Sequence, residues 1–502
     1  MMRLQVLHPL ARSDVRSREL FSRGELSASI RAAESSSLPS DRILHVYALE
    51  RLGRYRDALA AIATIPNGGS DQQLLLRALA AECHLLLGEA GTARRLLKEV
   101  GEPAAGIKVR FELVYAAMLL AWVEGAPDAM DAVLATIDVR EMPELQARWL
   151  FGASWAAALR SDYPKQLALL VEAIGQLQMP GAYDVTLLAT ATRSLVHLVR
   201  EVASPGAFEF AVAVTQSIPW TRDVERERFL TFRGLAWAYA LRGSHETALR
   251  YAFAARDIAP SKMWVTACYA DHAYLSRMAR EDATSNALLR HAVGCAKEID
   301  WTSSGEERVA ILSLIELAAD RDLDDARRLL EIYDDIPVVL APQLALAHDR
   351  RLRAMEEYAR GTVFAASGDR TSAVELLRSS YSTFTSIGYA WRAAAAALRL
   401  NAVTEETRWL RLAAAAVESF PESSVAAAIR EKAVGLRDPR TASLTPAQRR
   451  VYELLCQGLG DKEIAAALRL SPETVKNHAA RVRGAFGVRS RAALVAAARR
   501  VG

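Results

Sequence analysis

The chain has few cysteines, and their wide spacing argues against disulfides or a zinc site. Only four occur in 502 residues, and no two of them form a C-x-x-C pair. A disulfide framework or a zinc site built on thiolates needs closely spaced pairs. We therefore expect buried free thiols in a reducing cytosol at Cys83, Cys268, Cys295 and Cys456.

Long hydrophobic runs are also missing. The longest strongly apolar stretch, "LVYAAMLLAWV" at Leu113–Val123, has eleven residues between two glutamates, whereas a membrane-spanning helix needs about 20. The N-terminal stretch "MMRLQVLHPLARSDVRSREL" lacks the apolar segment of a signal peptide. These absences predict a soluble, cytoplasmic protein without a membrane partner.

Motifs for nucleotide or hydrolytic chemistry are absent as well. A P-loop requires a Gly-Lys dipeptide, which occurs nowhere in the chain. The patterns G-x-S-x-G and H-E-x-x-H do not occur either, and the histidines are scattered singly. We expect no enzymatic activity, no cofactor and no metal; an enzyme within the helical region is a third hypothesis without a supporting motif.

One stretch resembles a calcium loop, "DRDLDDARRLLE" at 320–331. Its alternating aspartates and Glu331 have ligand spacing, but Asp325 stands where the sharp turn needs Gly, and two arginines follow. The alternative, a turn followed by a helix whose acidic first turn suits its dipole, is favoured.

The charge of the chain is unevenly distributed. From Thr441 onward there are eleven Lys or Arg against four Asp or Glu, a net charge of +7, while the preceding residues sum to −3. An excess of positive charge confined to one end is typical of an appended module that binds a polyanion.

Strand patterns are scarce before residue 440, and Ala, Leu, Arg and Glu recur with helical spacing. A Gly is followed five positions later by an Ala in four places: Gly53 and Ala58, Gly88 and Ala93, Gly243 and Ala248, Gly368 and Ala373. The Gly permits a tight turn between two helices, and the Ala lets the second helix pack closely on the first.

This pattern resembles the tetratricopeptide repeat, and "GLAWAYALRGSHETALRYAFAARDIAP" at Gly234–Pro260 is its best copy. The resemblance implies an α-solenoid, and an irregular α-solenoid is the alternative. Its concave surface would suit a peptide, a protein or a small-molecule effector. The nine Trp residues, all before residue 410, could line that surface, but a core position is favoured for each.

After residue 443 four helices can be read from their start and stop signals. Thr445-Pro446-Ala447-Gln448 has the sequence of a capping box, so the first helix should run to about Gln457. Asp461 should cap a second helix ending at Leu468. Ser471 should cap a third, which Gly487 ends, and Ser490 should start a fourth.

The second and third of these helices form a helix-turn-helix pattern, whose later helix is expected in the major groove of DNA. On that helix a buried stripe is expected at Val475, Ala479, Val482 and Phe486. The opposite side then presents Lys476, Asn477, Ala480 and Arg483, with Thr474, His478 and Arg481 at its margins. Lys and Arg suit phosphates or guanine edges, and Asn suits adenine.

The segments "LTP", "GLGDKEIA", "LSPETVKNH" and "GVRSRAALV" resemble the signature segments of the LuxR-type helix-turn-helix domain. The resemblance implies a four-helix domain that binds double-stranded DNA, commonly as a homodimer paired through its fourth helix. Carried over residue by residue, it implies DNA contacts by Lys462, Thr474, Lys476, Asn477, His478, Arg481, Arg483, Arg489 and Arg491. It implies dimer contacts by Leu494, Val495 and Ala498.

The leading hypothesis is therefore an all-α, cytoplasmic, bacterial transcriptional regulator, for which RNA polymerase is a candidate partner. Its expected parts are a tetratricopeptide-like α-solenoid that binds an effector or partner (1–430), a linker (431–443) and a LuxR-type DNA-binding domain (444–502). The alternative is a helical-repeat scaffold for protein interactions whose helix-turn-helix remnant no longer binds an operator.

Overall fold

A computed structural model of the 502-residue chain describes residues 15–34, 38–66, 68–98, 105–179, 184–202, 204–299, 301, 305–336, 350–434, 443–456, 459–468, 470–491 and 493–495. Within these ranges the chain is helical, with no strand. The predicted all-α class, an α-solenoid followed by a small helical domain, is confirmed.

Antiparallel helix pairs make up the long N-terminal part. The pairs are α1 (Val15–Ser22) and α2 (Leu26–Glu34), α3 (Pro39–Arg51) and α4 (Tyr55–Thr64), α5 (Ser70–Leu86) and α6 (Ala90–Lys98), α7 (Ile107–Val123) and α8 (Pro127–Leu134), α9 (Pro143–Leu159) and α10 (Tyr163–Leu177), α11 (Val185–Glu201) and α12 (Pro205–Ser217), α13 (Glu225–Ala240) and α14 (His245–Asp257), α15 (Lys262–Met278) and α16 (Asp282–Ala296), α17 (Gly305–Ala319) and α18 (Leu323–Asp335), α20 (Arg350–Ser367) and α21 (Arg370–Ser386), and α22 (Ala390–Thr404) and α23 (Thr407–Ala416). The described residues of this part also form the short 3-10 turns η1 (Arg222–Val224) and η2 (Val417–Ser419) and the helix α24 (Ser424–Val434). The first helix of a pair also packs on the first helix of the next pair, as α5 does on α7 and α11 on α13, which stacks the pairs into a solenoid.

The predicted turn chemistry is confirmed at all four repeat turns. Gly53, Gly88, Gly243 and Gly368 have φ values of 73°, 86°, 77° and 84°, in the left-handed region that L side chains seldom adopt. The Ala five residues after each of them is fully buried. The same spacing occurs where the sequence had no Gly: Arg280 adopts a φ of 65° and is followed five residues later by the buried Ser285.

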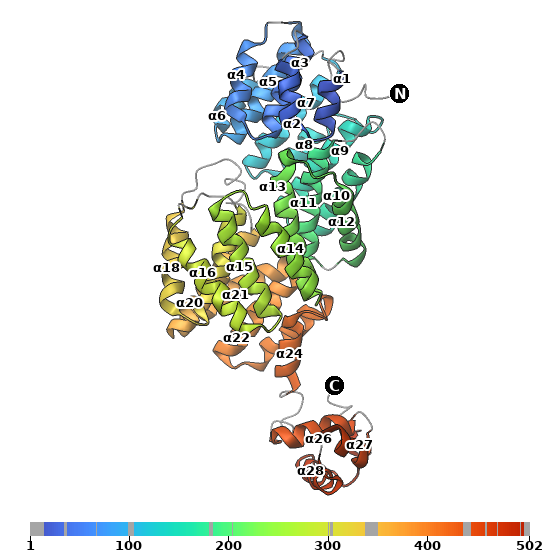
Figure 1. The fold of residues 1–502 in the computed structure, drawn as a ribbon, viewed down its shortest axis with the longest axis vertical. Helices are drawn as coiled ribbons and strands as arrows, with labels where there is room; N and C mark the ends of the chain where they lie inside the picture. The colour runs from blue at the N-terminus through green and yellow to red at the C-terminus, as the bar shows by residue number, and fades with distance from the viewer. Residues whose placement is uncertain are drawn as a thin grey trace.

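Hydrogen bonds also connect helices of the solenoid that lie far apart in the chain. The backbone N–H of Ser27, in α2, donates to Asp223 Oδ2 at 2.8 Å, 196 residues away. Trp391, in α22, donates from Nε1 to Glu201 Oε2, at the end of α11, at 2.7 Å across 190 residues. Figure 1 shows the resulting elongated body, with α1 to α12 in one half and α14 to α24 in the other.

Buried ion pairs connect first helices of successive pairs along the solenoid. In the first half Arg148 of α9 holds Glu112 of α7 through two hydrogen bonds, at 2.6 and 2.9 Å. In the second half Arg233 of α13 holds Asp271 of α15 at 2.6 Å, and both side chains are less than 10% exposed. Each pair therefore joins the first helices of two successive helix pairs.

The tryptophans follow the favoured core interpretation. All nine are buried or half-buried. Trp237 also donates to Asp271 at 3.0 Å and stacks on Trp391 with ring centroids 5.9 Å apart. Buried Trp side chains commonly find such a partner for the N–H. Through these contacts Trp237 joins α13 to α15 and α22.

The stretch at 320–331 is a turn and a helix start, as favoured. Asp322 caps α18 by accepting from the backbone N–H groups of Asp324 and Asp325, both at 3.1 Å. Asp320 instead accepts hydrogen bonds from two arginines. The carboxylates are thus engaged with the protein itself.

Candidate nucleic-acid interface

The C-terminal module has a hydrophobic core of its own. Its helices are α26 (Pro446–Cys456), α27 (Asp461–Leu468) and α28 (Pro472–Ala485). Figure 1 shows them beyond α24, at the end of the elongated body. The core consists of Leu444, Val451, Leu455, Ile464, Ala465, Val475, Ala479, Val482, Phe486 and Leu494. The expected stripe on α28 is therefore buried, with Val475 and Val482 at 0% exposure.

Side-chain hydrogen bonds cap the first two helices, reciprocally at α26 and by a single bond at α27. Gln448 Oε1 accepts from the Thr445 backbone N–H at 2.9 Å, and Thr445 Oγ1 accepts from the Gln448 N–H at 3.3 Å, which is the predicted capping box. At α27 the Gly460 N–H donates to Glu463 Oε2 at 2.6 Å. The expectation that Asp461 is the cap was wrong, because Asp461 is already the first helical residue.

The third helix is held at both ends as expected. Ser471 Oγ accepts from the Thr474 N–H at 3.1 Å, and Pro472 occupies the first turn, where its missing N–H is not needed. Gly487 ends the helix with a φ of 64°. These local bonds fix the length of α28 and hence the number of side chains that its outer face presents.

The outer face of α28 carries polar and basic side chains. Lys476, Asn477, Ala480 and Arg481 are exposed, whereas Thr474, His478 and Arg483 are half-buried. The sequence had placed Arg483 on the face and Arg481 at its margin, and the structure reverses the two. The reason is the helical period: residues three or four apart line one side, so 477 and 481 lie opposite the buried pair Val475 and Val482.

His478 occupies a special position beside this face. Its Nδ1 is buried and has no hydrogen-bond partner among the residues that the structure describes. Thr474, one turn earlier, shares its hydroxyl with Ser471 at 2.8 Å. The Thr474 side chain is therefore held by Ser471, the residue that caps α28.

The basic residues outside α28 divide into two kinds. Lys462 and Arg489 are exposed. Arg491 turns inward instead: its guanidinium donates to the backbone carbonyl of Leu459 and lies 4.0 Å from Asp461 Oδ1. Arg491 therefore holds the start of α27, and only part of its side chain faces solvent.

The residues expected at a dimer surface are also divided. The sequence analysis placed Leu494 on an open surface that pairs two copies. This expectation was wrong, because Leu494 is fully buried in the core of its own module. It reaches the core because Ser490 starts a helical turn that directs it inward, with the Leu494 N–H bonded to Ser490 O at 3.1 Å. Val495 is half-buried, and Ala498 lies outside the described residues.

Together these features define a helix-turn-helix module attached to a helical-repeat body. A compact core fixes α28 from one side, and the other side offers amine, amide and guanidinium groups on successive turns, which is the chemistry that contacts base edges and phosphates. Among the described residues no group of His, Cys, Asp or Glu could hold a metal ion. Nor does that part of the chain contain a helix long and apolar enough to cross a membrane.

Residues 442–498 match the family "Bacterial regulatory proteins, luxR family", so this segment is a LuxR-type helix-turn-helix domain. No curated protein sequence matches the chain.

Solved structures with similar architecture are helical-repeat proteins. A Rap protein complexed with competence and sporulation factor has 12% identity, covers 75% of this chain and 100% of its own, and has a TM-score of 0.38. The apo quorum sensor NprR from B. thuringiensis has 10% identity, 81% and 100% coverage and a TM-score of 0.43. The human IFIT1 dimer with PPP-AAAA has 15% identity, 86% and 98% coverage and a TM-score of 0.39.

Proposed function

We propose that this protein is a cytoplasmic transcriptional regulator that binds promoter DNA by placing α28 in the major groove. The observation that carries the proposal is the exposed face formed by Lys476, Asn477, Ala480 and Arg481, on a helix whose opposite side is packed into a core. An outward row of donors on a firmly held helix suits groove recognition. The LuxR-type domain implies regulation of transcription.

Within this face, Asn477 and Lys476 are the proposed base readers. Asn can form two hydrogen bonds to adenine, and Lys can donate to guanine acceptors. Ala480 offers a methyl group, which suits a thymine methyl. Arg481 is proposed to contact base or phosphate, while Lys462 and Arg489 are proposed to contact phosphates only.

Thr474, His478, Arg483 and Arg491 have smaller roles in this proposal. Each is half-buried, and Thr474 and Arg491 already bond within the module. We propose that they border the contact and hold its geometry.

The proposal includes a division of labour and a dimer. Residues 1–430 are proposed to bind an effector or partner, 431–443 to link, and 444–502 to bind DNA as a homodimer, with Val495 and Ala498 but not Leu494 at the contact between copies. A promoter-bound regulator meets RNA polymerase, which is therefore a proposed partner.

The test uses the full chain. An operator is first selected from random duplexes, and binding to this operator and to random DNA is then measured at increasing salt concentration. Lys476→Ala should lower affinity and reduce the salt slope by about one, because one cation leaves the interface. Lys98→Ala is the matched control, since Lys98 is an exposed lysine at the end of α6. If the unaltered protein shows no salt-dependent DNA binding, the scaffold alternative replaces this proposal.

A further inference from the structure

Open space in the helical-repeat body lies near its C-terminal end. One pocket of about 550 Å³ lies between α17, α20, α21 and α22, and a second of about 670 Å³ lies between α15, α17, α22 and α24. The two adjoin, because Asp320, Arg399 and Ala402 line both. Their sizes are those of ordinary small-molecule sites. We call them together the α24 pocket.

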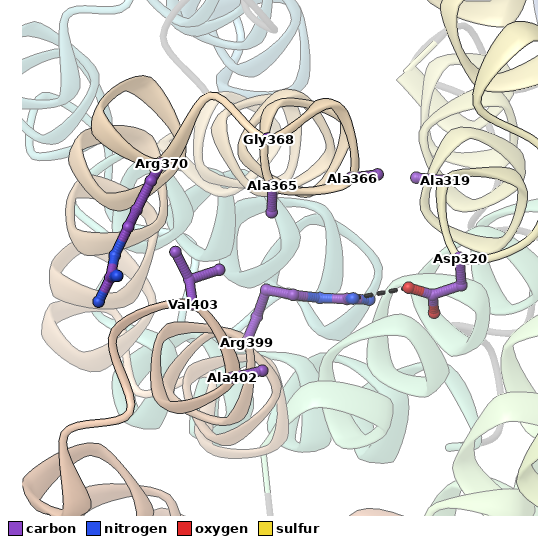
Figure 2. Close-up of a pocket in the computed structure, with 9 residues that line it drawn as sticks. All are labelled: Ala319, Asp320, Ala365, Ala366, Gly368, Arg370, Arg399, Ala402 and Val403. Atoms are coloured by element: carbon purple, nitrogen blue, oxygen red, sulfur yellow. Dashed lines mark hydrogen bonds and ion pairs between the residues drawn. The ribbon is translucent and has the colours of Figure 1, made fainter.

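Two arginines meet one carboxylate at the centre of this pocket. Arg399 Nη1 donates to Asp320 Oδ1 at 2.6 Å, and Arg277 Nη2 donates to Asp320 Oδ2 at 2.6 Å. Figure 2 shows Arg399 reaching from α22 to Asp320 at the end of α17. All three side chains are partly open to solvent, at 36% for Arg277, 23% for Arg399 and 21% for Asp320.

This triad carries an excess positive charge and spare donors. Burial alone would raise the pKa of Asp320, but Arg399 and Arg277 outweigh it and hold that pKa below its usual value, so the carboxylate is charged. Two guanidinium groups then face one anion. Each uses a single N–H on Asp320, although a guanidinium carries several donors in a planar fork that matches a carboxylate.

The neighbouring acidic group is already neutralised. Glu316 is buried at 5% exposure and accepts hydrogen bonds from Tyr274 and from Arg392, the latter at 3.3 Å. Its oxygens are thus engaged by other side chains, although its charge still contributes to the raised pKa of Arg277 and Arg399. Apart from Arg370, which donates to the Thr404 carbonyl oxygen at 3.2 Å, the remaining wall of the first pocket is built of small apolar residues, which leave room for an apolar chain: Ala319, Ala365, Ala366, Gly368, Ala402 and Val403.

The other wall of the pocket is α24, the last helix that the structure describes before the DNA-binding domain. Ser424, Val425, Ala428, Glu431 and Lys432 of α24 line it. Across the same pocket Arg280 forms an ion pair with Glu431 at 2.5 Å. α24 ends at Val434, and the capping box of α26 begins at Thr445. A ligand seated here touches the described helix that precedes the module in the chain.

We propose that the α24 pocket binds an effector that carries a carboxylate on a short apolar chain, with the carboxylate held by Arg277 and Arg399 and the chain along α22 and α24. Contact with α24 then alters the affinity of the module for DNA. The proposal rests on the proposed function, because its output is operator binding. A peptide C-terminus and a free organic acid share this chemistry.

The experiment uses the full chain and two pairs of probes: tetraalanine as free acid or C-terminal amide, and octanoate or octanamide. Calorimetry measures probe binding, and fluorescence anisotropy measures operator affinity with and without the probe. We expect at least one acid to bind about tenfold more tightly than its amide, because a charged carboxylate forms stronger hydrogen bonds with guanidinium groups than a neutral amide does. Preference for tetraalanine identifies a peptide terminus, and preference for octanoate an organic acid.

Two variants test the location of binding. Arg399→Gln should weaken acid binding about tenfold and leave the amide unaffected. Arg378→Gln is its control, since Arg378 on α21 pairs with Glu406 and does not line the pocket. Ala402→Phe fills the space without removing a charge, so it guards against a folding defect in the arginine variant. Ala415→Phe, at an exposed alanine on α23, is its control.

The proposal is overturned if neither acid binds in preference to its amide, if Ala402→Phe binds the acids normally, or if acid binding leaves operator affinity unchanged. In each case the ligand-free protein still binds its operator. Absence of operator binding in the ligand-free and ligand-bound protein alike is instead the failure of the proposed function.

Discussion

The buried ion pair between Glu112 and Arg148 offers a quantitative test of the fold. Glu112 is 4% and Arg148 11% exposed at the side chain, and two hydrogen bonds join them. The Arg148 guanidinium also lies over the Tyr115 ring, 4.4 Å from its centroid. Glu112→Gln removes the anion and leaves the cation buried among aromatic rings. We expect a loss of about 3–5 kcal/mol, the cost of an uncompensated buried charge.

A second glutamate in the same region serves as the matched comparison. Glu82 is 2% exposed, and its Oε1 has no hydrogen-bond partner among the described residues. Burial, together with Glu50 and Glu112, raises the pKa of Glu82 well above its usual value, which favours the protonated carboxyl. Gln mimics the protonated carboxyl, so Glu82→Gln should not destabilise the protein.

The two glutamates also predict opposite pH dependences. The pKa of Glu112 is lowered: burial opposes this, but Arg148 outweighs it, so its stabilisation is present above the unfolded pKa and is lost as pH falls through the folded value. Glu82 has a raised folded pKa, so its unfavourable effect grows as pH rises above the unfolded value. Glu82→Gln should therefore gain stability relative to the unaltered protein as pH rises above about 4, the pKa of an unfolded glutamate.

The assay must resolve local stability, because a repeat array need not unfold in one step. Hydrogen exchange of peptides from α7 and α9, followed by mass spectrometry, gives local opening free energies, and thermal unfolding gives the global effect. Equal destabilisation by Glu112→Gln and Glu82→Gln would mean that both carboxyls are charged. That result would refute the assignment of protonation states.

Further predictions concern the DNA face, the module core and a repeat turn. Asn477→Ala should remove about 1–3 kcal/mol of specific binding and relax preference at one base pair, whereas Arg489→Ala should weaken binding to all sequences alike. A salt titration on operator and random DNA separates the two variants. Equal losses of affinity for operator and random DNA in Asn477→Ala would contradict base reading. Leu494→Asp should unfold the module, because it places a charge in the core, and a module that keeps its helix content and melting temperature would refute this. Gly243→Ala should cost more than Gly368→Ala in thermal unfolding: both strain a left-handed φ, but only at Gly243 would the new Cβ lie 2.9 Å from a backbone oxygen, that of Glu422. Equal losses would show that the contact relaxes freely.

The sequence by itself determined the features that depend on neighbouring residues. The turn glycines and the buried alanines five positions later, the capping box at Thr445 and the buried stripe at Val475 and Val482 all follow from local geometry with a fixed helical period. Signals of this kind are read within one or two helical turns. The dimer contact, the DNA-contacting residues and the domain boundaries stay predictions.

Only the tertiary structure decided which side chains meet across the superhelix. Asp320 binds Arg277 and Arg399, which lie 43 and 79 residues away, and Trp391 binds Glu201 across 190 residues. The same holds on a smaller scale for Arg491, whose partner carbonyl is 32 residues away. The curvature of the stacked pairs sets these contacts, and that curvature sums small rotations between successive repeats. The residue pattern within a single helix does not determine this curvature. The α24 pocket could therefore be found only in the folded chain.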